Sequence, residues 1–137
     1  MTDKHCTRLI LIAEDDPDDQ DLIAIAFSRV DPTLKICFVS DGQEALDYLY
    51  QTASDGLPCV IVLDYNMPEL NGAQVLQQLF PDERFADIPK VIFSTSSNPL
   101  YIQDCMSKGA NAYKVKPHDF SKLLDVAKEM AALCEAA

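Results

Sequence analysis

The feature that most constrains the fold is a set of five short apolar runs, four of them rich in β-branched residues. They are Leu9–Ala13, Ile36–Val39, Cys59–Leu63, Val91–Phe93 and the weaker Ala112–Val115. Each run is too short for a buried helix and too continuously apolar for a strand with one face in water. Strands that are covered on both faces have this composition, so the runs predict a buried parallel sheet.

Helical periodicity fills the segments between these runs. Apolar residues recur at helical spacing across residues 23–30, 45–49, 75–79, 102–106 and 120–131. The chain therefore alternates strand and helix five times, which predicts an α/β fold with a five-stranded parallel sheet, right-handed crossovers and helices on both faces. A chain of 137 residues has the length of one domain, so we expect a single domain over residues 1–137 with no output domain.

Composition limits the partners of such a domain. The chain has 22 Asp and Glu against 11 Lys and Arg, a formal net charge of -11, and its basic residues form no run. Nucleic-acid backbones are bound by clustered Lys and Arg, so we expect no nucleic-acid partner. The first apolar run is too short for a signal peptide or a membrane span, so we expect no membrane partner and a cytoplasmic location.

The cysteines are few and scattered. They are Cys6, Cys37, Cys59, Cys105 and Cys134. Their number is odd and none is paired in a Cys-x-x-Cys motif, which argues against a disulfide framework or a zinc site. Mostly apolar neighbours instead predict buried free thiols in a reducing compartment.

Polar residues follow four of the five predicted strands. These segments are Glu14-Asp15-Asp16, Asp64-Tyr65-Asn66, Ser94-Thr95-Ser96 and Lys116-Pro117. The functional crevice of an open parallel sheet lies beyond the carboxyl ends of its strands, so these side chains are expected to meet there. Clustered carboxylates need a cation, and oxygen ligands of this kind suit Mg²⁺ or Mn²⁺. A divalent ion, a lysine and a carboxylate nucleophile are the groups that phosphoryl transfer requires.

A second group of acids follows the first strand more distantly. Pro17 stands where a first helical turn would begin, and Asp18, Asp19 and Asp21 come directly after it. Acidic residues at this position stabilise the positive end of a helix, so we interpret these three as helix-start acids. Asp16 fits either the crevice or the helix start.

In this order, the residues at the strand ends resemble the receiver domain of two-component response regulators, over nearly the whole chain. The resemblance is carried by Glu14-Asp15, the Asp-x-x-Met-Pro pattern of Asp64–Pro68, Gly72, Ser94, Gly109-Ala110, Tyr113 and Lys116-Pro117. It implies the flavodoxin-like strand order 2-1-3-4-5. The opening Glu14–Asp19 and the segment Asp41–Leu46 look like the small stand-alone regulators that partner bacterial phytochromes.

The resemblance implies roles for the acidic residues and the lysine. Asp64 would be the phosphoacceptor, and Lys116 would form an ion pair with it and then with its phosphoryl group. The metal, Mg²⁺ or Mn²⁺, would be held by Glu14, Asp15, Asp64 and the backbone carbonyl of Asn66. The Lys116–Pro117 peptide would be cis, as it usually is in the family. Such a protein catalyses only its own phosphorylation and dephosphorylation, so we do not expect an enzyme in the ordinary sense.

The resemblance also implies a switch with a hydroxyl and an aromatic ring. Ser94 and Thr95 both qualify as the hydroxyl, and the family's usual spacing from Asp64 and Lys116 favours Ser94. Tyr113 matches the aromatic residue that moves inward when the hydroxyl turns toward the phosphoryl group, and a core tyrosine would also explain it.

The resemblance implies two partners, a sensor histidine kinase and a downstream protein target or phosphotransfer protein. The resemblance to the phytochrome-associated subfamily implies that the kinase is a phytochrome kinase. The fourth helix, fifth strand and fifth helix would form the readout surface, and the subfamily resemblance adds homodimerisation. The alternative is a pseudo-receiver, a protein-binding module that is never phosphorylated.

Overall fold

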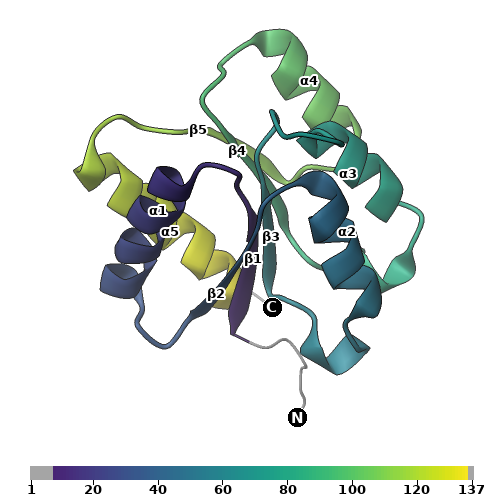
Figure 1. The fold of residues 1–137 in the computed structure, drawn as a ribbon, viewed down its shortest axis with the longest axis horizontal. Helices are drawn as coiled ribbons and strands as arrows, with labels where there is room; N and C mark the ends of the chain where they lie inside the picture. Colours follow the sequence, from purple (N-terminus) through teal and green to yellow (C-terminus); the bar gives the residue numbers. More distant parts are fainter. Residues whose placement is uncertain (1–7, 136–137) are drawn as a thin grey trace.

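The structure, a computed structural model that describes residues 8–135, alternates strand and helix along its length (Figure 1). The strands are β1 (Leu9–Ala13), β2 (Lys35–Val39), β3 (Val60–Leu63), β4 (Lys90–Ser94) and β5 (Ala112–Val115). The helices are α1 (Pro17–Val30), α2 (Gly42–Gln51), α3 (Gly72–Leu79), α4 (Pro99–Ser107) and α5 (Phe120–Glu135). All strand pairs are parallel and the sheet order is β2-β1-β3-β4-β5, which confirms the predicted fold class and strand order.

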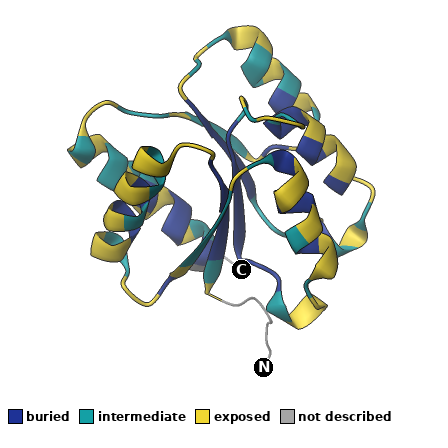
Figure 2. Ribbon diagram, viewed as in Figure 1, coloured by how far each residue is buried: buried dark blue, intermediate teal, exposed yellow. Residues whose placement is uncertain are grey.

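Helices cover both faces of the sheet. In Figure 1, α1 and α5 lie on one face, and α2, α3 and α4 lie on the other. Because successive strand side chains point to opposite faces, Ile10 and Ile12 of β1 pack in the layer of α1 and α5, whereas Leu11 and Ala13 pack in the opposite layer. The central strands are therefore buried on both sides, as Figure 2 shows in dark blue.

Short polar residues begin the helices. Asp16 is the N-cap of α1, where its carboxylate accepts the Asp18 N–H, and Pro17 occupies the first turn. Asn98 and Pro99 repeat this arrangement at α4. These caps satisfy N–H groups that have no partner inside the helix. The cap assigns Asp16, which the sequence left open, to the helix start.

The prediction of free thiols is wrong for two cysteines. Cys59, directly before β3, forms a disulfide with Cys134 near the end of α5, and their Cα atoms are 5.0 Å apart. Cys105 is free and buried, as predicted, and Cys37 is free but half-buried. Cys6 lies outside the described residues. No local sequence pattern marks this pair, because 75 positions separate its members and only the fold brings them together.

The expected cis peptide between Lys116 and Pro117 is also wrong, because no peptide bond within residues 8–135 is cis. Trans is the lower-energy isomer even before proline. With the trans peptide, the Lys116 backbone N–H still donates to the Ser94 carbonyl of β4 at 2.8 Å, and the side chain still enters the site described below.

No helix in the described part of the chain is long and apolar enough to cross a membrane.

Candidate functional site

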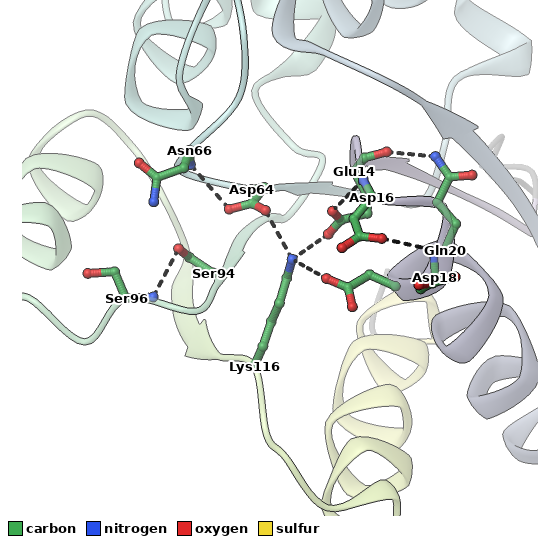
Figure 3. A network of polar contacts seen from close by, with 10 residues as sticks. Glu14, Asp16, Asp18, Gln20, Asp64, Asn66, Ser94, Ser96 and Lys116 are labelled. Carbon is green, nitrogen blue, oxygen red and sulfur yellow. Dashed lines mark hydrogen bonds and ion pairs between the residues drawn. The ribbon is translucent and has the colours of Figure 1, made fainter.

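Three strands deliver charged side chains to one edge of the sheet. Glu14 follows β1, Asp64 follows β3 and Lys116 follows β5, and Figure 3 shows the three side chains pointing toward one another. Glu14 and Asp64 are buried. The positions agree with the sequence prediction that the strand ends converge, because all five strands run in the same direction.

The Lys116 ammonium contacts three carboxylates (Figure 3). Its Nζ donates to Asp64 Oδ2 at 3.0 Å, to Asp19 Oδ2 at 3.2 Å and to Glu14 Oε1. The Lys116 side chain is only 11% exposed. Burial by itself would lower the pKa of this ammonium, but the hydrogen bonds and negative charges of Glu14 and Asp64 outweigh it and raise the pKa well above its usual range. Lys116 is therefore a permanent cation in this site.

Backbone and amide groups orient the two buried carboxylates. The Asp16 N–H donates to Glu14 Oε2 at 3.1 Å, and the Asn66 N–H donates to Asp64 Oδ1 at 3.2 Å. The Gln20 side chain reaches back from α1 to the Glu14 carbonyl at 2.6 Å. Burial raises the pKa of Glu14 above its usual value, against the opposing effect of Lys116 and the Asp16 N–H.

Glu14, Asp15 and Asp64 form a group that has the right donors for a metal. One carboxylate oxygen from each lies within 4.8 Å of the others, and Asp15 is exposed whereas the other two are buried. Carboxylate oxygens at this spacing fit a hard divalent cation. Asn66, the fourth predicted ligand, is exposed and lies two positions after Asp64 in the chain.

Ser94 and Thr95 have opposite environments. Ser94 ends β4 with no exposed surface, and its Oγ accepts the Ser96 N–H at 3.3 Å. Thr95 is exposed. Tyr113 of β5 is half-buried, and its hydroxyl donates to the Ser96 carbonyl at 2.7 Å. Burial raises the pKa of Tyr113, so the phenol stays protonated. Ser96 thus connects the two predicted switch residues.

Gly72 explains how α3 approaches the site so closely. A Cβ atom at this position would lie 2.8 Å from the Asp64 carbonyl oxygen and 3.0 Å from Ile92 Cδ1. The Gly72 N–H donates to the Tyr65 carbonyl at 3.1 Å. A glycine is needed because no side chain fits between the helix and the strand end.

Sequence reasoning missed three contributors to the site. Asp19 was interpreted only as a helix-start acid, and neither Gln20 nor the backbone of Ser96 was considered. The Asp19–Lys116 contact joins residues 97 positions apart, and no local pattern marks it. The Gln20 contact spans six positions, and a strand-to-helix junction followed by a glutamine is too common to single it out.

Comparison with known proteins settles the family. The family model described as the response regulator receiver domain matches residues 10–128. This chain belongs to the response regulator receiver family. Receiver domains are signalling domains of two-component systems rather than classical enzymes, and they interact with histidine kinases and downstream targets. The family binds Mg²⁺ or Mn²⁺ in its acidic pocket, where this receiver has Glu14, Asp15 and Asp64.

Individual relatives cover most of this receiver. It is 34% identical over 124 residues to the probable methanogenesis regulatory protein FilR2 of Methanothrix harundinacea, which covers 89% of this chain and 80% of that protein. It is similar to the phosphorylated cyanobacterial phytochrome response regulator RcpA, with a TM-score of 0.83, 30% identity and coverage of 93% and 94% of the two chains. The response regulator RPA3017 of red light signalling in R. palustris matches with a TM-score of 0.79, 31% identity and coverage of 88% and 89%.

Proposed function

We propose that Asp64 accepts a phosphoryl group from the phosphohistidine of a sensor histidine kinase, and that the modified receiver changes its binding to a protein partner. The observation that carries this proposal is the Lys116 ammonium, held 3.0 Å from Asp64 Oδ2 beside the Glu14–Asp15–Asp64 group. A nucleophilic carboxylate with a fixed cation next to it supplies the positioning and charge neutralisation that phosphoryl transfer needs.

The transfer is a simple exchange of bonds at phosphorus. A carboxylate oxygen of Asp64 forms the new P–O bond, the P–N bond to the kinase histidine breaks, and the imidazole leaves with the electron pair of that bond. The Asn66 N–H on Asp64 Oδ1 fixes the orientation of the carboxylate. Lys116 neutralises charge that develops on the phosphoryl oxygens, because it is already held at this carboxylate.

Glu14, Asp15, Asp64 and the backbone carbonyl of Asn66 would hold Mg²⁺, or Mn²⁺ in its place. When bound, the ion neutralises charge on the transferred group. The donor set fits this role, since three carboxylates offer oxygens within 4.8 Å of one another.

The proposed readout begins at Ser94 and Tyr113. Ser94 is buried at the end of β4, and Tyr113 lies on the neighbouring strand with its hydroxyl on Ser96. A shift of either residue acts on the surface of α4, β5 and α5, where Leu100, Met106 and Val115 are exposed. We assign this surface to a downstream protein or phosphotransfer partner. The likeness to RcpA supports a phytochrome kinase as the proposed donor. A cytoplasmic location is part of the same proposal.

Acetyl phosphate and Mg²⁺ provide the test, with intact-protein mass spectrometry as the readout. We expect the chain to gain one phosphoryl group and Asp64→Asn to gain none, because the amide is not a nucleophile. Asp16→Asn is the matched control, since Asp16 is an exposed acid at the same rim that caps α1. This control should still be phosphorylated.

Two outcomes would contradict the proposal. Phosphorylation of Asp64→Asn would mean that another residue is the acceptor. A wild-type chain that gains no phosphoryl group from acetyl phosphate or from any histidine kinase of its host would instead support the pseudo-receiver. Circular dichroism of each variant excludes loss of folding as the cause.

A further inference from the structure

Among the residues that the structure describes, Asp19 is the one carboxylate that accepts from Lys116 and lies outside the proposed metal and phosphoacceptor group. It belongs to the first turn of α1, its Oδ2 is 3.2 Å from Lys116 Nζ, and its side chain is 35% exposed. A lysine ammonium has three donors. Glu14, Asp19 and Asp64 together accept from Lys116, so each N–H has a carboxylate partner.

A divalent ion would disturb two of these three contacts. Glu14 already uses Oε1 for Lys116 and Oε2 for the Asp16 N–H, and Asp64 uses Oδ2 for Lys116. An ion held by Glu14 and Asp64 therefore competes with the ammonium for the same carboxylates. The two cations also repel each other, strongly at this depth of burial.

Asp19 is not among the three carboxylates whose oxygens lie within 4.8 Å of one another. Its position is also well defined, because the Asp16 cap and the Gln20 contact with the Glu14 carbonyl tie the start of α1 to the end of β1. Asp19 thus offers Lys116 an anchor that an incoming ion leaves in place.

We propose that Asp19 is a positioning residue for Lys116, which holds the ammonium on the α1 side of the crevice when a divalent ion takes Glu14 and Asp64. The inference rests on the proposed function of the site. It predicts that Asp19 favours metal binding by drawing the Lys116 ammonium away from the Glu14 and Asp64 oxygens that the ion needs, while the ammonium stays inside the same crevice.

Calorimetric titration with Mg²⁺ of the unphosphorylated chain tests the role of Asp19 without any activity assay. We expect Asp19→Asn to raise the Kd for Mg²⁺ by about three- to fivefold more than Asp18→Asn does, the effect of one partly exposed charge pair. Asp18 is the matched control, because it is an exposed acid of the same helical turn whose carboxylate forms no hydrogen bond or ion pair with a described residue. Both variants remove one negative charge, so the control measures the general electrostatic effect.

Repeating the titrations with Asp19→Asn and Asp18→Asn in a Lys116→Met background isolates the effect of the Asp19–Lys116 ion pair. Without the ammonium, Asp19→Asn and Asp18→Asn should change the Kd equally, because Asp19 then has no cation to hold. A purely structural role of Asp19 would leave the difference unchanged in this background. Urea denaturation of all variants identifies any that do not fold.

The outcomes separate this inference from the proposed function. Equal effects of Asp19→Asn and Asp18→Asn in a wild-type chain that binds Mg²⁺ and is phosphorylated on Asp64 would overturn the role of Asp19 alone. A difference that persists in the Lys116→Met background would also overturn it. A wild-type chain that does not bind Mg²⁺ would overturn the proposed metal site and the role of Asp19 together.

Discussion

At the residue scale, the site depends on buried charges that stabilise one another. Glu14 and Asp64 are buried carboxylates, and a buried charge is costly unless it is paired and hydrogen-bonded. Lys116 pairs with both, and backbone N–H groups bind the oxygens that remain. The arrangement holds the Asp64 carboxylate, the Lys116 ammonium and the neighbouring carboxylates within contact distance of one another. Such preorganisation is what the proposed phosphoryl transfer would require.

The hydroxyls at residues 94 and 95 give a prediction at this scale. We expect Ser94→Ala to leave phosphorylation of Asp64 in place but to weaken the linked change at Tyr113. A charge-assisted hydrogen bond contributes about 1.5 to 3 kcal/mol, which is roughly 10- to 150-fold in the equilibrium of the switch. NMR spectra of the Tyr113 ring, with and without acetyl phosphate and Mg²⁺, measure this equilibrium.

Thr95→Ala is the control for Ser94→Ala, because Thr95 is exposed and Ser94 is buried. It should respond to phosphorylation like the wild-type chain. If Thr95→Ala instead blocks the change at Tyr113 and Ser94→Ala does not, the switch hydroxyl is Thr95.

At the element scale, helix α5 is held to the sheet in two ways. Its apolar residues pack against α1 and the central strands, and the Cys59–Cys134 disulfide ties its last turn to the start of β3. Both ends of this bond are buried. A cross-link over 75 residues removes much of the freedom of the unfolded chain, so it stabilises the fold even though it contacts nothing in the functional site.

We predict that Cys134→Ser lowers the free energy of unfolding by about 2 to 4 kcal/mol under oxidising conditions. Urea denaturation measures this change, with Cys37→Ser as the matched control because Cys37 is free. Dithiothreitol should destabilise the wild-type chain and Cys37→Ser to a similar degree, and it should leave Cys134→Ser unaffected. Equal stability of the two variants without reductant would show that the disulfide does not form in solution.

At the scale of the whole molecule, charge is distributed unevenly along the chain. Residues 1–97 contain 17 acidic and 6 basic residues, whereas residues 98–137 contain 5 of each, so the first 97 residues carry the whole net charge of -11. Self-repulsion of this size destabilises a compact state and is reduced by salt. Part of the excess has a specific location, since Glu14, Asp15 and Asp64 meet at one edge of the sheet.

Mg²⁺ should therefore raise the Tm of the protein by more than the ionic strength of the added magnesium salt explains. At about a hundredfold excess over the Kd, binding contributes about 2.7 kcal/mol, or roughly 8 °C in Tm for a domain of this size. Thermal unfolding in Mg²⁺ and in NaCl of equal ionic strength separates the two effects. Asp15→Asn should lose the specific increase and keep the salt effect, since Asp15 is exposed and its replacement leaves the core intact. An equal rise in Tm in both salts would contradict a metal site.

Much of the fold follows from local patterns that the sequence displays directly. The predicted runs Leu9–Ala13 and Ala112–Val115 coincide with β1 and β5. The predictions for β2 and β3 differ by one residue at the first end, and the prediction for β4 differs by one residue at each end. The signal was clear because strands buried on both faces are continuously apolar. The positions of Glu14, Asp64 and Lys116 followed from the same pattern, because each residue comes directly after a buried strand.

Contacts between distant segments had no such signal. The sequence by itself determined the alternation of strand and helix, the parallel sheet and the residues at its carboxyl edge, since hydrophobic periodicity and chain order are local properties. Only the tertiary structure decided that Asp19 contacts Lys116, that Cys59 pairs with Cys134 and that Ser94 is buried while Thr95 is exposed. These outcomes depend on the distances and orientations of side chains from different elements, which are set when the layers pack together.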